Sequence, residues 1–169
     1  MDTSATQTHP SPEQIEEASA LILEVLENGG TLGDVKGFTP EEVEAVYALA
    51  YNLFQQQKYE EAEKLFQFLC FYEHLDKRFW MGLGGCRQHL KQYEGAIDAY
   101  SVLGMLDMEN PYPPLHAADC YVALGDMEKA ESALEAAIHW SGDNDQYQGV
   151  KSRAALLLEA INTPKEAPA

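Results

Sequence analysis

The sequence has few basic residues. Its 169 residues include 11 Lys and Arg against 28 Asp and Glu, which gives a formal net charge of −17. Affinity for nucleic acid comes mainly from phosphate contacts to Lys and Arg, so this balance argues against DNA or RNA as a partner, and equally against docking on anionic lipid. It suits a carrier that stays dissolved while it holds an apolar or basic client.

Long apolar runs and paired cysteines are also lacking. No run approaches the roughly 20 apolar residues needed to span a bilayer, so membrane insertion is not expected. Residues 1–10 lack the positive region followed by an apolar stretch that marks a secretory signal. Cys70, Cys86 and Cys120 form no CxxC motif. An odd number of thiols inside predicted helices favours buried, reduced cysteines in a reducing cytoplasm.

The most informative pattern is a repeat of 34 residues. Three alanines recur at this spacing, each followed four residues later by a large side chain: Ala62 with Phe66, Ala96 with Tyr100, and Ala130 with Leu134. A small residue fits where two helices cross, and the large residue one turn later fills the next groove. A 34-residue period of this kind is typical of tetratricopeptide repeats. The sequence therefore predicts an all-α fold, a tandem array of three repeats over about 43–76, 77–110 and 111–144.

The segments outside the repeats complete the predicted organisation. We expect a disordered N-terminus (1–10), a helical arm or cap (11–38), the repeat region (39–144), a C-terminal capping helix (145–162) and a flexible tail (163–169). Apolar residues of the first helix extend beyond one face, and two interpretations stay open: a homodimer formed through this helix, or a cap that packs under repeat one. The stripe on one face is Ile15, Ala18, Ile22, Val25 and Leu26, and Leu21 and Leu23 extend it.

Each inner helix of such an array turns its second, fifth, ninth and twelfth residues toward a concave groove. The residues at these positions are Glu44, Tyr47, Tyr51 and Phe54 in repeat one, Arg78, Met81, Gly85 and Gln88 in repeat two, and Tyr112, Leu115, Asp119 and Val122 in repeat three. Aromatic and Met side chains in a groove indicate an apolar ligand, unless the arm or the final helix folds back over them. Peptide binding is therefore the function that the architecture favours.

Little in the sequence points to chemistry. His116, Asp119 and Cys120 share one helix at a spacing that metal ligation or a Cys–His pair could use. However, His116 and Cys120 fall at interior repeat positions, and no second cluster completes a site. Gly82-Leu83-Gly84-Gly85 lies within a predicted helix, so it is not a phosphate-binding loop. We expect no catalytic residue, no metal site and no cofactor, and therefore no enzyme.

Several segments resemble one particular family of tetratricopeptide proteins. They are Gly29–Thr31, Leu49–Phe54, Lys58–Ala62, Arg78–Gln88 with Tyr93–Ile97, and Leu115–Cys120 with Gly125 and Ala130–Glu131. In order and spacing they are similar to the class II chaperones of bacterial type III secretion systems, over roughly residues 15–160. The resemblance implies a cytoplasmic chaperone for two hydrophobic translocator proteins that later form a pore in the host membrane. Several members also help to regulate secretion genes, so a transcriptional regulator is a second expected partner.

The resemblance also assigns the groove that holds the client. It places a short extended segment of the translocator against Tyr47, Tyr51, Phe54, Tyr59, Arg78, Met81, Gln88 and Tyr112. The family often has Phe where this chain has Tyr51 and Tyr where it has Phe54, which leaves the pockets apolar but changes their chemistry. The alternative is a general scaffold that grips a C-terminal carboxylate. That mode needs Lys and Asn where this chain has Tyr47 and Tyr51, and Lys and Arg where it has Tyr112 and His116, so a carboxylate would find no cation there.

Overall fold

The computed structural model describes residues 11–163, and this part of the chain is helical and without strands. The helices are α1 (Pro12–Glu27), α2 (Leu32–Lys36), α3 (Pro40–Gln55), α4 (Tyr59–Tyr72), α5 (Lys77–His89), α6 (Tyr93–Leu106), α7 (Tyr112–Leu124), α8 (Met127–Ser141) and α9 (Gln148–Asn162), with a short 3₁₀ turn, η1 (Asp145–Tyr147), before α9. The predicted all-α fold is confirmed. The N-terminal residues 1–10 and the tail residues 164–169, for which we predicted disorder and flexibility, lie outside the described residues.

Polar caps set where several helices begin. Thr39 and Glu42 form a capping box at the start of α3, and Thr31 and Asp34 form another at α2. The side chain of Asp76 accepts a hydrogen bond from the Arg78 N–H at the start of α5. These groups satisfy N–H donors that the first turn of a helix leaves unpaired.

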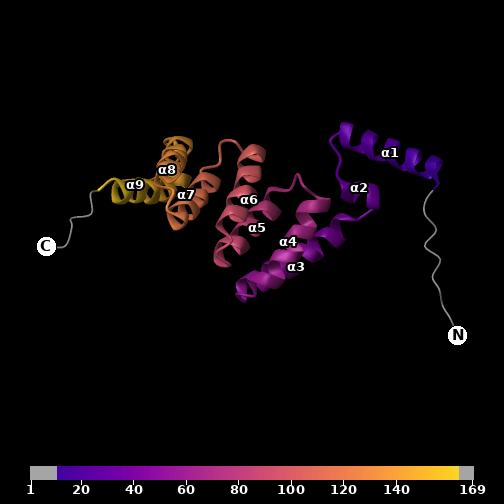
Figure 1. The fold of residues 1–169 in the computed structure, drawn as a ribbon, viewed down its shortest axis with the longest axis horizontal. Helices are drawn as coiled ribbons and strands as arrows, with labels where there is room; N and C mark the ends of the chain where they lie inside the picture. The colour runs from indigo at the N-terminus through magenta and orange to yellow at the C-terminus, as the bar shows by residue number, and fades with distance from the viewer. Residues whose placement is uncertain (1–10, 164–169) are drawn as a thin grey trace.

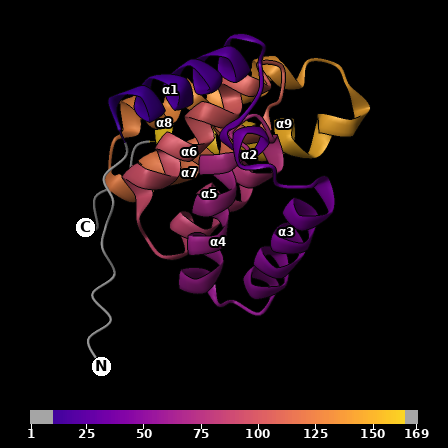
Figure 2. The same cartoon turned by 90° about the vertical axis from the view of Figure 1, so that its right-hand side faces the viewer.

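Consecutive helices pack in pairs, α3 with α4, α5 with α6 and α7 with α8, and α9 closes the array against α8. The pairs follow one another in an elongated molecule with α9 and α1 at opposite ends (Figure 1). Seen along this axis, the helices of successive pairs lie behind one another (Figure 2). The array is the quasi-one-dimensional arrangement in which each repeat packs only on its neighbours.

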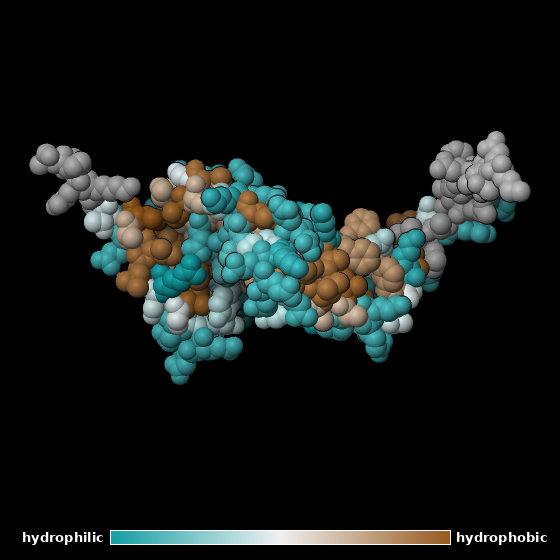
Figure 3. All heavy atoms as spheres, turned by 90° about the horizontal axis from the view of Figure 1, so that it is seen from below, coloured by the Kyte–Doolittle hydropathy of each residue, from teal (hydrophilic) through white to brown (hydrophobic). Residues whose placement is uncertain are grey.

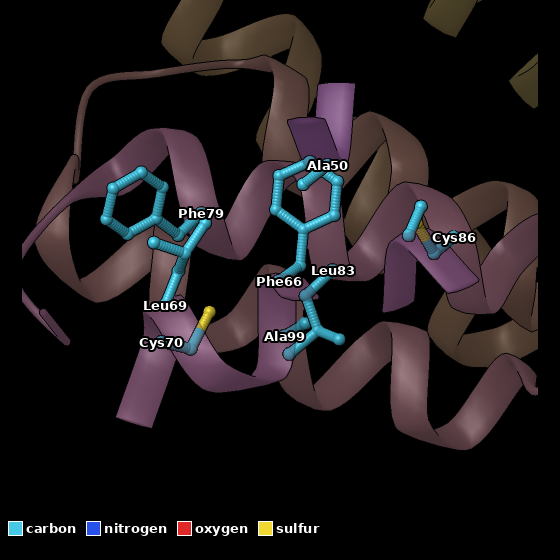
Figure 4. Close-up of a cluster of buried hydrophobic side chains, with 9 residues drawn as sticks. Ala50, Phe66, Leu69, Cys70, Phe79, Leu83, Cys86 and Ala99 are labelled. Atoms are coloured by element: carbon cyan, nitrogen blue, oxygen red, sulfur yellow. The ribbon is translucent and has the colours of Figure 1, made fainter. Parts of the chain in front are cut away.

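The repeating alanines occupy the helix crossings. Ala62, Ala96 and Ala130 are fully buried. Phe66, from α4, lies in a cluster of buried side chains that includes Leu83 and Phe79 of α5 (Figure 4). The three cysteines are free and buried, and burial raises the pKa of each thiol to about 12. A thiol with such a pKa is a poor nucleophile at neutral pH, so these cysteines act as small apolar side chains.

The N-terminal helix stands apart from the helix pairs (Figure 1). α1 packs on α2, and α2 in turn contacts α4. Phe38, just after α2, packs against Phe68 and Tyr72 of α4 with ring centroids 5.8 and 5.1 Å away. In the predicted dimer stripe, the side chains of Ile15, Ala18, Ile22 and Leu26 lie outside the described residues, whereas Val25 is half-buried.

Candidate functional site

The inner helices α3, α5 and α7 line a pocket with a volume of about 260 Å3. Two buried rings from the outer helices, Phe66 of α4 and Tyr100 of α6, complete its floor. The full set of lining residues is Tyr47, Tyr51, Phe54, Phe66, Arg78, Met81, Gly82, Gly85, Gln88, His89, Tyr100 and His116. A pocket of this composition offers mainly apolar and aromatic contacts with a few polar groups, as ligand pockets commonly do.

Most of the predicted groove residues meet in this pocket. Six of them line it, namely Tyr47, Tyr51, Phe54, Arg78, Met81 and Gln88. Tyr59 supports the wall from behind, because its ring stacks on His89 at 4.3 Å and meets Phe54 edge-on at 5.3 Å. Tyr112 flanks the pocket, with its ring 6.3 Å from that of His116.

Aromatic rings form the α3 side of the pocket. The rings of Tyr47 and Tyr51 lie 6.2 Å apart, and Tyr47 also packs on the buried Phe79 at 5.6 Å. Tyr51 is 49% exposed, so its ring is partly in contact with solvent in the free protein. Covering such a ring with a ligand would remove apolar surface from water at roughly 25 cal/mol per Å2.

Arg78 is held by carboxylates on two helices. Its Nη2 lies 2.5 Å from Glu44 of α3 and 2.7 Å from Asp76 at the start of α5, and its guanidinium covers the Tyr47 ring at 4.7 Å. Hydrogen bonds to Asp76 and then to Glu44 raise the pKa of Arg78. The two carboxylates therefore balance the positive charge of Arg78 and hold its side chain against the wall of the pocket.

The α7 side of the pocket is more polar. The Tyr100 hydroxyl donates to Gln88 Oε1 at 2.8 Å, and the His116 ring stacks on Tyr100 at 5.3 Å. Asp119 lies 3.9 Å from His116 Nδ1 and accepts a 2.7 Å hydrogen bond from Arg153 of α9. Burial lowers the pKa of His116, so its imidazole is neutral near pH 7.

One detail of the sequence analysis was wrong, and others were incomplete. Leu115, predicted to face the groove, is only 2% exposed because α9 packs on this part of the array and places Val150 in the same apolar cluster as Leu115 and Leu134. His116, predicted to be interior, is largely buried and also lines the pocket. Phe66 and Tyr100 were not assigned to the groove, although their place four residues after Ala62 and Ala96 marks them as side chains that fill the space between helices.

Gly85 has no side chain, so the α5 wall of the pocket leaves room for a ligand. A Cβ at Gly85 would lie 3.2 Å from the Phe54 ring, which is tighter than an ordinary contact. Any larger residue would therefore push into the pocket or displace Phe54. This position lets the backbone of a bound peptide come close to α5.

Neither a metal cluster nor a membrane span is found in the described part of the chain. Among residues 11–163, no three His, Cys, Asp or Glu side chains gather closely enough to hold a metal ion. Within the same residues, no helix is both long and apolar enough to cross a membrane. The face of the molecule seen in Figure 3 is largely hydrophilic with separate hydrophobic areas.

Comparisons with known proteins agree with this architecture. Tetratricopeptide repeat models match residues 43–76 and 89–154. The low calcium response locus protein H of Yersinia pestis is 40% identical over 141 residues, which cover 83% of this chain and 84% of that protein. The chaperone protein SicA of Salmonella typhimurium is 30% identical over 158 residues, with 93% and 91% covered.

Solved structures give the same result. The type III secretion translocator chaperone SycD of Yersinia enterocolitica superposes with a TM-score of 0.72 at 38% identity, over 78% of this chain and 98% of SycD. SycD in complex with a peptide of the translocator YopD superposes with a TM-score of 0.70 at 40% identity, over 73% and 94% of the two chains. By its repeats, its helix order and these relatives, the chain belongs to the family of class II, tetratricopeptide-repeat chaperones of bacterial type III secretion systems.

Proposed function

We propose that this protein is a cytoplasmic chaperone that binds hydrophobic translocator proteins through the pocket on α3, α5 and α7 and keeps them soluble and competent for secretion. The observation that carries the proposal is the aromatic pocket itself, lined by six of the eight residues that the family resemblance assigns to the client. Two relatives support it: SycD was solved with a peptide of the translocator YopD, and PcrH with the chaperone-binding regions of PopD and of PopB.

An extended peptide fits this pocket best. Side chains of an extended strand alternate in direction, so every second apolar side chain can enter while the backbone runs across the inner helices. Tyr51, Phe54 and Met81 supply apolar contact, and the Gln88 amide can donate to a peptide carbonyl while its Oε1 is held by Tyr100. Arg78 would act through its position over Tyr47 rather than as a free cation.

The carboxylate-gripping scaffold is less well supported. A bound C-terminal carboxylate needs uncommitted cations, and the single Arg in the pocket is shared between Glu44 and Asp76. The proposal includes no catalytic step, because binding and release of a client require none. A regulatory partner, such as a transcription factor, stays a prediction.

The proposal extends to a homodimer formed through α1. This helix packs on the short α2, and its Leu23 is 59% exposed. An apolar side chain that the helix pairs do not cover is available to a second copy. The relative SycD has been solved in an arrangement described as an alternative dimer.

Co-expression with a translocator tests the proposal, and YopD is the first to try. We expect YopD to be soluble and to co-purify with the wild-type chain. The double variant Tyr51→Ala/Phe54→Ala should release it while the helical circular dichroism spectrum is kept. Insoluble translocator beside a folded, unoccupied chain would argue against the function, and equal recovery with both chains would argue against the pocket.

A further inference from the structure

A second pocket lies between the outer helices α6 and α8, at the start of α7. Its volume is about 390 Å3, which falls in the range of small-ligand pockets. It is lined by Tyr100, Ser101, Gly104, Met105, Met108, Pro113, Pro114, Ala117, Ala133 and Trp140. Of these, only Tyr100 also lines the inner pocket, so the two pockets are separate sites with one ring between them.

The repeat register explains why this pocket is apolar. One repeat earlier, Cys70, Trp80 and Leu83 hold the places of Gly104, Pro114 and Ala117, and they line an equivalent hollow with Arg87 and His74. There the Trp80 indole N–H donates to the His74 carbonyl at 2.7 Å, and Arg87 pairs with Glu63. The α6–α8 pocket has neither of these polar groups at the matching positions.

Two hydroxyl groups of the lining are already paired within the protein. Ser101 Oγ donates to the Ile97 carbonyl at 2.8 Å, and the Tyr100 hydroxyl donates to Gln88. At the rim, Met105 is 70% exposed and Met108 is 72% exposed. Exposed methionines beside an apolar hollow form an adaptable contact surface, because the thioether chain can repack around different apolar side chains.

The charged residues around the pocket are mostly acidic, which favours a basic partner. From residue 92 to residue 150, Lys129 is the only Lys or Arg, against eleven Asp and Glu. Trp140 also borders an adjoining hollow with Asp107, Glu109 and Asp143. Asp107 pairs with Lys77 and Asp143 with Lys151. Glu109 has no such ion pair among the described residues, so it can receive a cation from a partner.

This charge also excludes the nearest alternative occupant. The α1 helix of a second copy is apolar, but it carries five Glu and no Lys or Arg. Glu109 would repel such a helix. A cation that follows an apolar anchor would instead meet Glu109 and the face of the Trp140 ring.

We propose that the α6–α8 pocket docks a second partner protein through a basic amphipathic segment, one whose bulky apolar side chains enter the pocket beside Lys or Arg. This partner binds at a different site from the translocator of the proposed function. Both can be bound at once, because only the buried Tyr100 is common to the two pockets.

Filling the pocket tests the proposal. A Cβ at Gly104 would have only an ordinary contact, 3.9 Å from Pro113, so Gly104→Leu can place its side chain in the pocket without a backbone clash. The matched control is Gly149→Leu, because nothing lies within 4 Å of a Cβ at that helical glycine. The probe is a fluorescein-labelled peptide of about four helical turns, with Leu and Phe on one face and Lys on the other. Its counterpart has Glu in place of Lys.

Fluorescence anisotropy should show binding of the Lys peptide to wild type and to Gly149→Leu, and binding weaker by about tenfold or more to Gly104→Leu. The Glu peptide and the variant Glu109→Lys should each lose a similar factor. Equal binding of the Lys peptide to wild type and Gly104→Leu, or of the two peptides to wild type, would overturn the proposal.

Two further measurements identify other occupants. If Gly104→Leu changes the mass of the protein in light scattering, a second copy fills the pocket and the proposal is wrong. If Gly104→Leu releases a co-expressed translocator, the pocket is part of the translocator site and the proposal is again wrong. If the Gly104→Leu chain still binds the translocator but no longer binds the Lys peptide, the proposal is supported. This outcome separates the α6–α8 pocket from the translocator site in the inner pocket.

Discussion

Single glycines decide how closely helices approach in this array. A Cβ at Gly84 would lie 2.5 Å from the ring of Tyr100, which is itself 2% exposed and cannot move aside into solvent. Gly84 sits on α5 and Tyr100 on α6, so the glycine sets the distance within this helix pair. The cost of glycine in a helix is offset by the packing it permits.

We therefore expect Gly84→Ala to destabilise the protein by about 1–3 kcal/mol through overpacking. Gly149→Ala is the control and should be neutral or stabilising by about 0.5–1 kcal/mol, because the added methyl meets nothing within 4 Å. Urea unfolding followed by circular dichroism measures both. Equal midpoints for the two variants would mean that α5 and α6 do not pack as described.

Tyr51 is the sharpest single probe of the inner pocket. Its ring is half exposed, whereas Tyr47 packs on the buried core, so only Tyr51 can be truncated with little loss of stability. Tyr51→Ala should weaken binding of a translocator peptide by about 1–2 kcal/mol in calorimetry. The control is Leu49→Ala, which removes a side chain of similar exposure on the same helix outside the pocket. A larger effect from Leu49→Ala would place the client elsewhere.

His116 makes stability depend on pH. Burial lowers its pKa below the value of 6.5 for an unperturbed imidazole, the nearby Asp119 opposes this shift, and Arg153 adds to it. The unfolded chain therefore binds the proton first as the pH falls. The stability contributed by the neutral, stacked imidazole is complete above about pH 6.5 and is lost as the pH drops through the lowered folded pKa.

His116→Phe keeps a ring on Tyr100 and removes the titration. Between about pH 7 and pH 5 the wild type should lose more stability than this variant. The other histidines are present in both chains, so their titration cancels in the comparison. Thermal melts at a series of pH values supply the comparison. Parallel curves would show that His116 is not buried as a neutral group.

Among the helices, α9 continues the repeat register beyond the three pairs. The ion pair of Asp119 with Arg153 joins residues 34 apart on α7 and α9, as that of Glu44 with Arg78 joins residues 34 apart on α3 and α5. α9 thus takes the place of the inner helix of a fourth repeat. It covers the apolar end of the array, where Leu115 and Leu134 would otherwise meet water.

Val150 anchors this cap, being 5% exposed within the cluster of Leu115 and Leu134. Val150→Asp should cost about 3 kcal/mol or more, because it buries a carboxylate without a partner. Ser152→Asp introduces the same side chain at an exposed position of α9 and should change stability by less than about 0.5 kcal/mol. Similar melting temperatures for the two variants would mean that α9 does not cap the core.

The helices form an elongated array with α1 at one end (Figure 1). The inner pocket and the α6–α8 pocket have different lining helices and share only Tyr100. If α1 forms the homodimer, deleting residues 1–28 should halve the mass found by light scattering and leave the repeats folded. Leu23→Asp, at an exposed apolar side chain of α1, should have the same effect. A full-length chain that is already monomeric at tens of micromolar would refute the dimer.

The sequence alone determined the repeat architecture and most of the inner pocket. Ala62, Ala96 and Ala130 mark helix crossings because steric exclusion acts on residue size, which can be read at a fixed spacing. The same register placed Tyr47, Tyr51 and Phe54 on one face of a helix, since helical periodicity is local.

The tertiary structure decided what depends on contacts between repeats. It placed Leu115 in the core, because the cover that α9 supplies comes from a helix 34 residues away, and it placed His116 in the inner pocket against Tyr100. It showed that Arg78 is bound to Glu44 and Asp76, and that small residues open an apolar pocket between α6 and α8. Burial and ion pairing are properties of neighbours in space, and the spacing of residues along the chain does not specify which neighbours those are.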